Sequence, residues 1–100
     1  MGTRERSFDE YLAAGGWSSK LFLPHARLAI PELQKEATVE FRRTLVTVTK
    51  GSRSVQLRVH HAGRDRKWMS ITDGQREITA HHHTETPEQV LSAVRAALNT

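Results

Sequence analysis

The sequence contains no cysteine among its 100 residues. This absence excludes disulfide bonds, thiolate zinc ligands and cysteine nucleophiles, and it is compatible with a reducing compartment. Long apolar runs are missing too, because runs such as residues 21–23 fall far short of the ~18 residues that span a bilayer. No apolar segment typical of a signal peptide follows residues 1–6. We therefore expect a cytoplasmic protein that does not associate with membranes.

Hydrophobic residues make up only 37% of the chain, which is enough for one domain with a shallow core. The net charge of +4 is unevenly distributed. Residues 41–83 carry nine basic and three acidic side chains, a net of +6, so the flanking segments together carry −2. Five of the six histidines lie in the same window. Its positive charge therefore increases below the ordinary histidine pKa of ~6.5.

The same window predicts an antiparallel sheet. Val55, Leu57 and Val59 alternate with polar residues, which is typical of a strand with one buried face. The neighbouring strands are expected at residues 44–49, 67–72 and 77–82, joined by short turns that contain glycine. The prediction is a four-stranded antiparallel meander within residues 38–83.

A helix is predicted after the sheet, over residues 86–99. Thr86 is a candidate N-cap, Pro87 suits the first helical position, and Gln89 completes a capping-box pattern. The apolar residues that follow recur on one face, and this face is expected to cover the aliphatic side of the sheet.

The N-terminal segment, residues 1–37, gives a weaker pattern. A short helix is expected to begin after Ser7 and to end at the glycine pair that follows it. Pro24 and Pro31 interrupt the remainder, where we expect an irregular path and a helical turn or short helix over residues 31–36. The fold class is therefore α+β, with residues 1–100 forming a single domain.

Two faces of the sheet follow from the alternation. If the aliphatic residues face the helix, Ile78 and Ala80 included, the opposite face is basic, hydroxylated and carries one large aromatic ring. Arginine and histidine can bind phosphates, and Trp68 can stack on a base. The candidate nucleic-acid-binding residues are Arg43, Arg58, His60, Arg66, Trp68, His81 and His83. The alternative is that the N-terminal segment covers Trp68 and that the basic side chains form an ordinary solvated surface.

The three consecutive histidines, residues 81–83, raise the question of a metal site. His81 and His83 lie ~6.6 Å apart on one strand face, where two imidazoles can chelate a metal. A third ligand is missing, since Glu77 and Glu85 do not complete a familiar zinc signature. We therefore expect no metal and no cofactor. We also expect no enzyme and no catalytic residues, because no nucleophile elbow, phosphate-binding glycine loop or H-E-x-x-H motif is present.

Two functions of different classes remain. The first is a small basic module that binds nucleic acid, either DNA or RNA, through the open face of the sheet. The second is a protein-interaction or assembly module, such as a homodimer, that uses the same face or an edge strand with Trp68 as its anchor. The charge of residues 41–83 favours the first, and no motif identifies a family.

Overall fold

The computed structural model describes residues 7–17, 20–42, 45–62, 66–74, 76–82 and 84–99. Within these residues, the chain forms three helices and five strands. In chain order they are α1 (Phe8–Ala13), α2 (Leu23–Gln34), β1 (Thr38–Phe41), β2 (Val46–Lys50), β3 (Arg53–Ala62), β4 (Arg66–Asp73), β5 (Arg76–His81) and α3 (Pro87–Leu98). The predicted α+β class is confirmed, but the sheet has five strands and not four.

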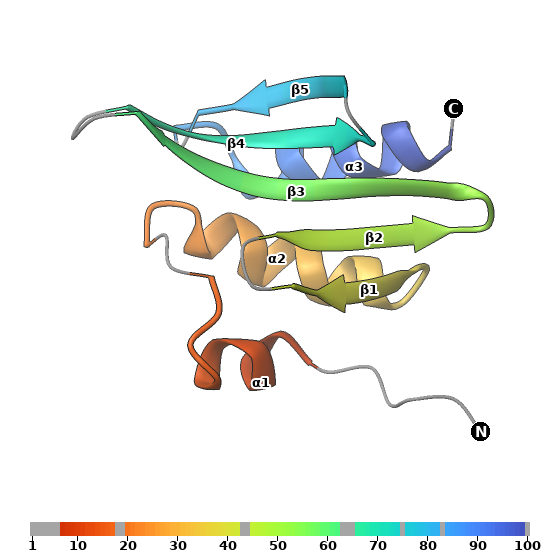
Figure 1. The fold of residues 1–100 in the computed structure, drawn as a ribbon, viewed down its shortest axis with the longest axis horizontal. Helices are drawn as coiled ribbons and strands as arrows, with labels where there is room; N and C mark the ends of the chain where they lie inside the picture. The colour runs from red at the N-terminus through yellow and green to blue at the C-terminus, as the bar shows by residue number, and fades with distance from the viewer. Residues whose placement is uncertain are drawn as a thin grey trace.

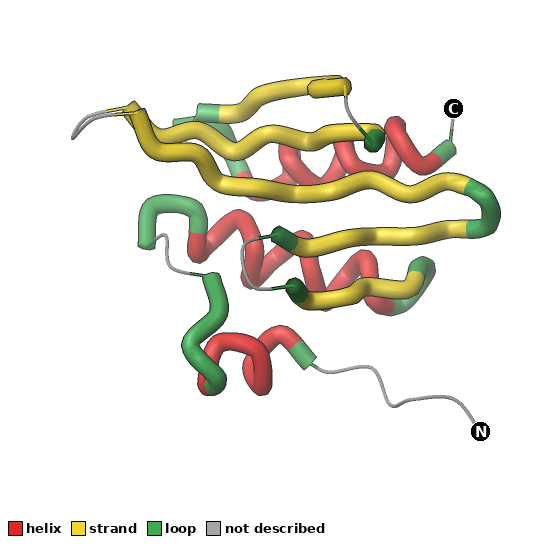
Figure 2. The backbone as a smooth tube through the Cα atoms, viewed as in Figure 1, coloured by secondary structure: helices red, strands yellow, loops and turns green. Residues whose placement is uncertain are grey.

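The strands form one antiparallel meander in the order β1-β2-β3-β4-β5. The helices α2 and α3 lie side by side against one face of this sheet, while α1 lies beyond the β1 edge (Figure 1). No helix of the described residues covers the opposite face (Figure 2). The fold is therefore a two-layer sandwich with one open sheet face. None of its described helices is long and apolar enough to cross a membrane.

The helix-facing side of the central strands carries the core. Val46 pairs with Leu57 and Val48 with Val55 across β2 and β3, and all four side chains are buried. The predicted facing of β3 is confirmed. The helices contribute the other half of this core through a buried set made up of Ala26, Ala29, Ile30, Leu33, Val90, Leu91, Val94, Ala97 and Leu98.

The capping interactions at α1 and α3 match the sequence pattern. The Thr86 hydroxyl accepts from the Gln89 backbone N–H, and the Gln89 side chain accepts from the Thr86 backbone N–H, which is a complete capping box. The Ser7 side chain accepts from the Glu10 backbone N–H at the start of α1. Both helix starts were therefore predictable from local sequence.

The length of α2 was not predicted. A helical turn or short helix was expected only at residues 31–36, whereas the helix begins at Leu23 and ends at Gln34. Pro24 lies in the first turn, where its missing N–H breaks no helical hydrogen bond. Pro31 lies inside the helix and is tolerated because Ile30 and Leu33 beside it are fully buried. Core packing here outweighs a weak intrinsic preference.

Strand β5 contains an irregularity that changes which face of the sheet its later side chains occupy. Thr72 pairs with Glu77, but the preceding Ile71 pairs with Thr79, so Ile78 is one extra residue in β5. A β-bulge of this kind moves every following side chain to the other face. The prediction that Ala80 faces the helices is wrong, because Ala80 is exposed and lies opposite Ser70 of the other face. Ile78, the bulge residue, retains 45% of its accessible surface and borders a hollow beside α3.

Candidate functional site

The open face of the sheet is polar across its central strands. Its side chains alternate with the buried aliphatic residues, and the residues of β2, β3 and β4 on this face are Thr47, Thr49, Ser54, Gln56, Arg58, His60, Trp68, Ser70 and Thr72. Arg58 lies opposite Ser70, and His60 lies opposite Trp68. The structure therefore places three of the predicted site residues, Arg58, His60 and Trp68, next to one another.

His60 and Trp68 form a stacked pair. Their ring centroids are 4.9 Å apart and the ring planes differ by only 15°. His60 Nε2 lies 2.6 Å from the hydroxyl of Ser70, which is the next residue of β4 after Trp68 on the same face. This hydrogen bond fixes the orientation of the imidazole. Trp68 is half-buried. The described N-terminal helix lies at the β1 edge, where Tyr11 stacks on Phe41, so it does not cover Trp68 (Figure 1).

A hollow of about 390 Å³ lies beside this pair. It is lined by Leu45, Gln56, Arg58, His60, Ser70, Thr72 and Gly74. The Gln56 side-chain oxygen accepts from the Thr72 hydroxyl at 3.2 Å and from the Gly74 backbone N–H at 3.2 Å. These two hydrogen bonds hold the Gln56 side chain in a fixed position in the lining of the hollow. Hydroxyl, imidazole and guanidinium groups around one hollow are suited to an anionic or hydrogen-bonding ligand.

Arg58 is an exposed cation on the described part of this face. Its side chain is exposed, and no carboxylate in the described ranges forms an ion pair with it. An arginine without a carboxylate partner keeps its donor groups available for a phosphate.

Of the other predicted site residues, the structure describes the side chain of His81 alone. Arg43 and His83 lie outside the described residues, as does the side chain of Arg66 in β4. His81 was predicted on the open face, but the bulge places it opposite Met69 on the helix-facing side, where it is only 7% exposed. His81 therefore cannot share a ligand with His60 through the open face.

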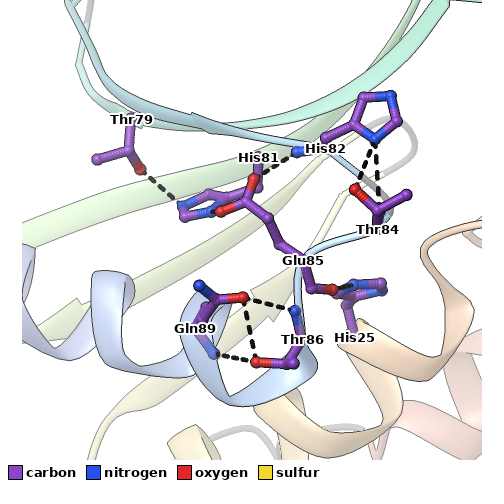
Figure 3. Close-up of polar contacts among 8 residues, drawn as sticks. All are labelled: His25, Thr79, His81, His82, Thr84, Glu85, Thr86 and Gln89. Atoms are coloured by element: carbon purple, nitrogen blue, oxygen red, sulfur yellow. Dashed lines mark hydrogen bonds and ion pairs between the residues drawn. The ribbon is translucent and has the colours of Figure 1, made fainter.

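His81 instead forms the centre of a polar cluster between β5 and α3 (Figure 3). Its Nε2 lies 3.0 Å from the Thr79 hydroxyl, and its Nδ1 lies 3.1 Å from Glu85 Oε1. The second carboxylate oxygen of Glu85 accepts from the His82 backbone N–H at 2.6 Å. This backbone hydrogen bond is the main cause that lowers the pKa of Glu85 below 4.5, with the His81 side chain adding to it against partial desolvation.

Helix α2 contributes His25 to the same corner. Its Nε2 donates to the backbone carbonyl of Glu85 at 2.6 Å, and the ring is buried. No described group bonds to its Nδ1. The corner thereby ties α2, β5 and α3 together through one residue, Glu85. Sequence reasoning considered Glu85 only as a metal ligand, because nothing in the local pattern signals the approach of His25 from 60 residues away.

The described residues contain no group of three histidine, cysteine or acidic side chains arranged to hold a metal ion. Comparison of the chain with protein-family models, with curated proteins and with solved structures finds no match. Evidence on function therefore comes from the open face of the sheet and from the polar cluster around His81.

Proposed function

We propose that the open face of the sheet binds single-stranded nucleic acid. The observation that carries this proposal is the exposed Arg58, which has no ion pair within the described residues, beside the stacked His60–Trp68 pair on a face that no described helix covers. Aromatic rings on an exposed sheet provide stacking surface for splayed bases, and a nearby arginine binds the connecting phosphates.

Stacking would supply most of the affinity at this site. The hydrogen bond between Ser70 and His60 holds the imidazole in place, and the imidazole in turn stacks on Trp68, so both rings are oriented before any ligand arrives. Base–aromatic stacking contributes about 1–3 kcal/mol per base, and a preorganised ring loses little conformational entropy on binding.

Charge supports the same class of ligand. Arg58 and His60 are two residues apart on β3, so their side chains emerge ~6.6 Å apart on one face. The surrounding residues 41–83 carry a formal charge of +6, which attracts a polyanion over longer distances. Stacking and phosphate contacts tolerate any base, so binding should show little sequence preference.

The test is a titration of a fluorescently labelled single-stranded oligonucleotide, followed by anisotropy. Trp68→Leu should weaken binding about tenfold or more, since a stacking surface is lost. A matched control is Trp17→Phe, which changes the second tryptophan, a residue packed at the edge of Phe8. Circular dichroism should show that both variants fold.

Two outcomes would overturn the proposal. The first is the absence of oligonucleotide binding at low salt, and the second is equal binding by the wild type and Trp68→Leu. If the wild type instead elutes as a dimer that Trp68→Leu converts to a monomer, the face is a protein interface and not a nucleic-acid site.

A further inference from the structure

Thr79, His81 and Glu85 form a continuous chain of hydrogen bonds. The two links are 3.0 Å from Thr79 Oγ1 to His81 Nε2 and 3.1 Å from His81 Nδ1 to Glu85 Oε1. An ionised carboxylate can only accept, so the neutral imidazole carries its proton on Nδ1. Its Nε2 is then the acceptor, and the Thr79 hydroxyl donates to it. This is the arrangement in which a histidine can remove a proton from a hydroxyl nucleophile.

The third member of this chain is firmly held. Glu85 binds the His82 backbone N–H through its other oxygen, and its carbonyl accepts from the buried His25. The lowered pKa of Glu85 keeps its carboxylate ionised at neutral pH. The carboxylate therefore fixes both the orientation and the tautomer of His81, which is the role of the third group in such a relay.

The threonine of this chain borders a surface hollow, whereas the imidazole is nearly buried. Thr79 is half-buried and lines a hollow of about 420 Å³ between β5 and α3, together with Arg76, Ala93, Ala96 and Ala97. The alanines leave room for a short apolar group. Two arginines and two carboxylates also line the hollow, namely Arg53, Arg76, Asp73 and Glu77.

We propose that Thr79 is a nucleophile for acyl transfer from esters with a short acyl group. Thr79 Oγ1 attacks the ester carbonyl carbon, and its proton passes to His81 Nε2. The bond between the carbonyl carbon and the alcohol oxygen then breaks, and the leaving alcohol takes that proton from Nε2. The products are an acyl ester on Thr79 and a free alcohol, with nothing oxidised or reduced. A water activated by His81 in the same way returns Thr79 to its free form.

This inference is independent of the nucleic-acid proposal, because the relay lies on the opposite side of the sheet. It departs from the sequence-based expectation that the chain has no catalytic residues. That expectation rested on known motifs, and Thr79 and His81 reach α3 only because of the bulge at Ile78.

The experiment uses the full chain and p-nitrophenyl acetate. Nitrophenolate release gives the rate, and mass spectrometry of the intact protein counts the acetyl groups. Fragmentation of the tryptic peptide 77–95, which begins after Arg76 and ends at Arg95, locates the adduct. We expect a single acetyl group on Thr79, and Thr79→Val should eliminate it.

Further variants separate chemistry from folding. Thr79→Ser keeps a hydroxyl and should remain acetylated, while Glu85→Gln should lower the rate about tenfold or more and His81→Gln about 100-fold. Thr84→Val is the matched control, since Thr84 is an exposed threonine of the same peptide, and its rate should be unchanged. Acetylation confined to histidine or lysine side chains would overturn the proposal. So would an unchanged adduct and rate in folded Thr79→Val.

Discussion

Two adjacent histidines should respond oppositely to truncation. His81 is 7% exposed and makes two side-chain hydrogen bonds, whereas His82 is exposed and its ring forms a hydrogen bond with the nearby exposed Thr84. Replacing His81 by alanine removes a buried ring, about 1–2 kcal/mol by area, and two hydrogen bonds of about 0.5–1.5 kcal/mol each. We therefore expect His81→Ala to lower the free energy of unfolding by about 2–5 kcal/mol and His82→Ala by less than ~1 kcal/mol.

Urea unfolding of both variants beside the wild type measures the difference. For a domain of this size, the His81→Ala loss corresponds to a melting temperature about 10 °C lower or more. Equal, small losses would mean that both rings lie in solvent. The bulge at Ile78 would then not exist, and the facing of β5 derived from its pairing with β4 would be refuted.

Other predictions concern the core and the acidic range of pH. Leu57→Ala should lower the free energy of unfolding by about 2–5 kcal/mol in chemical denaturation, because Leu57 is buried. Gln56→Ala on the open face should lower it by about 1 kcal/mol or less. Equal losses for the two variants would contradict the facing of β3. The pKa values of Glu85 and Glu36 are lowered in the folded state, that of Glu36 mainly by hydrogen bonds from Arg95. Each ionised carboxylate therefore stabilises the fold fully above its ordinary pKa. This contribution to the free energy of unfolding is lost as the pH falls through the lowered pKa of the folded state. Stability should therefore fall between about pH 5 and about pH 3, and Glu85→Gln should show a smaller fall; an identical fall in the variant would contradict the role of this carboxylate.

The parts of the fold that depend on local sequence were predictable. The alternation of Val55, Leu57 and Val59 correctly indicated which side of β3 is buried, and Thr86 with Gln89 correctly marked the start of α3. Arg58, His60 and Trp68 were placed together for the same reason, since facing on neighbouring strands follows from alternation and antiparallel pairing.

The parts that depend on packing were not predictable. Strand β1 has only four residues, too few for a clear alternation, and α2 contains Pro31, which argues against a helix in isolation. The bulge at Ile78 inserts one residue without any glycine or turn signal, so the open face was predicted to include His81. His81 and Glu85 are close in sequence, but His25 reaches Glu85 through tertiary structure alone.

The central claim is that the open sheet face binds the phosphates of a single strand through Arg58. The most direct measurement is the salt dependence of oligonucleotide affinity for Arg58→Gln, with Arg53→Gln as the matched control. Both arginines are exposed and lie on β3, but Arg53 lines the hollow beside α3 and not the open face. A lost phosphate contact on single-stranded nucleic acid should reduce the log–log salt slope by about 0.7 for Arg58→Gln and leave Arg53→Gln unchanged. Equal slopes for wild type and both variants, or a change confined to Arg53→Gln, would contradict the account.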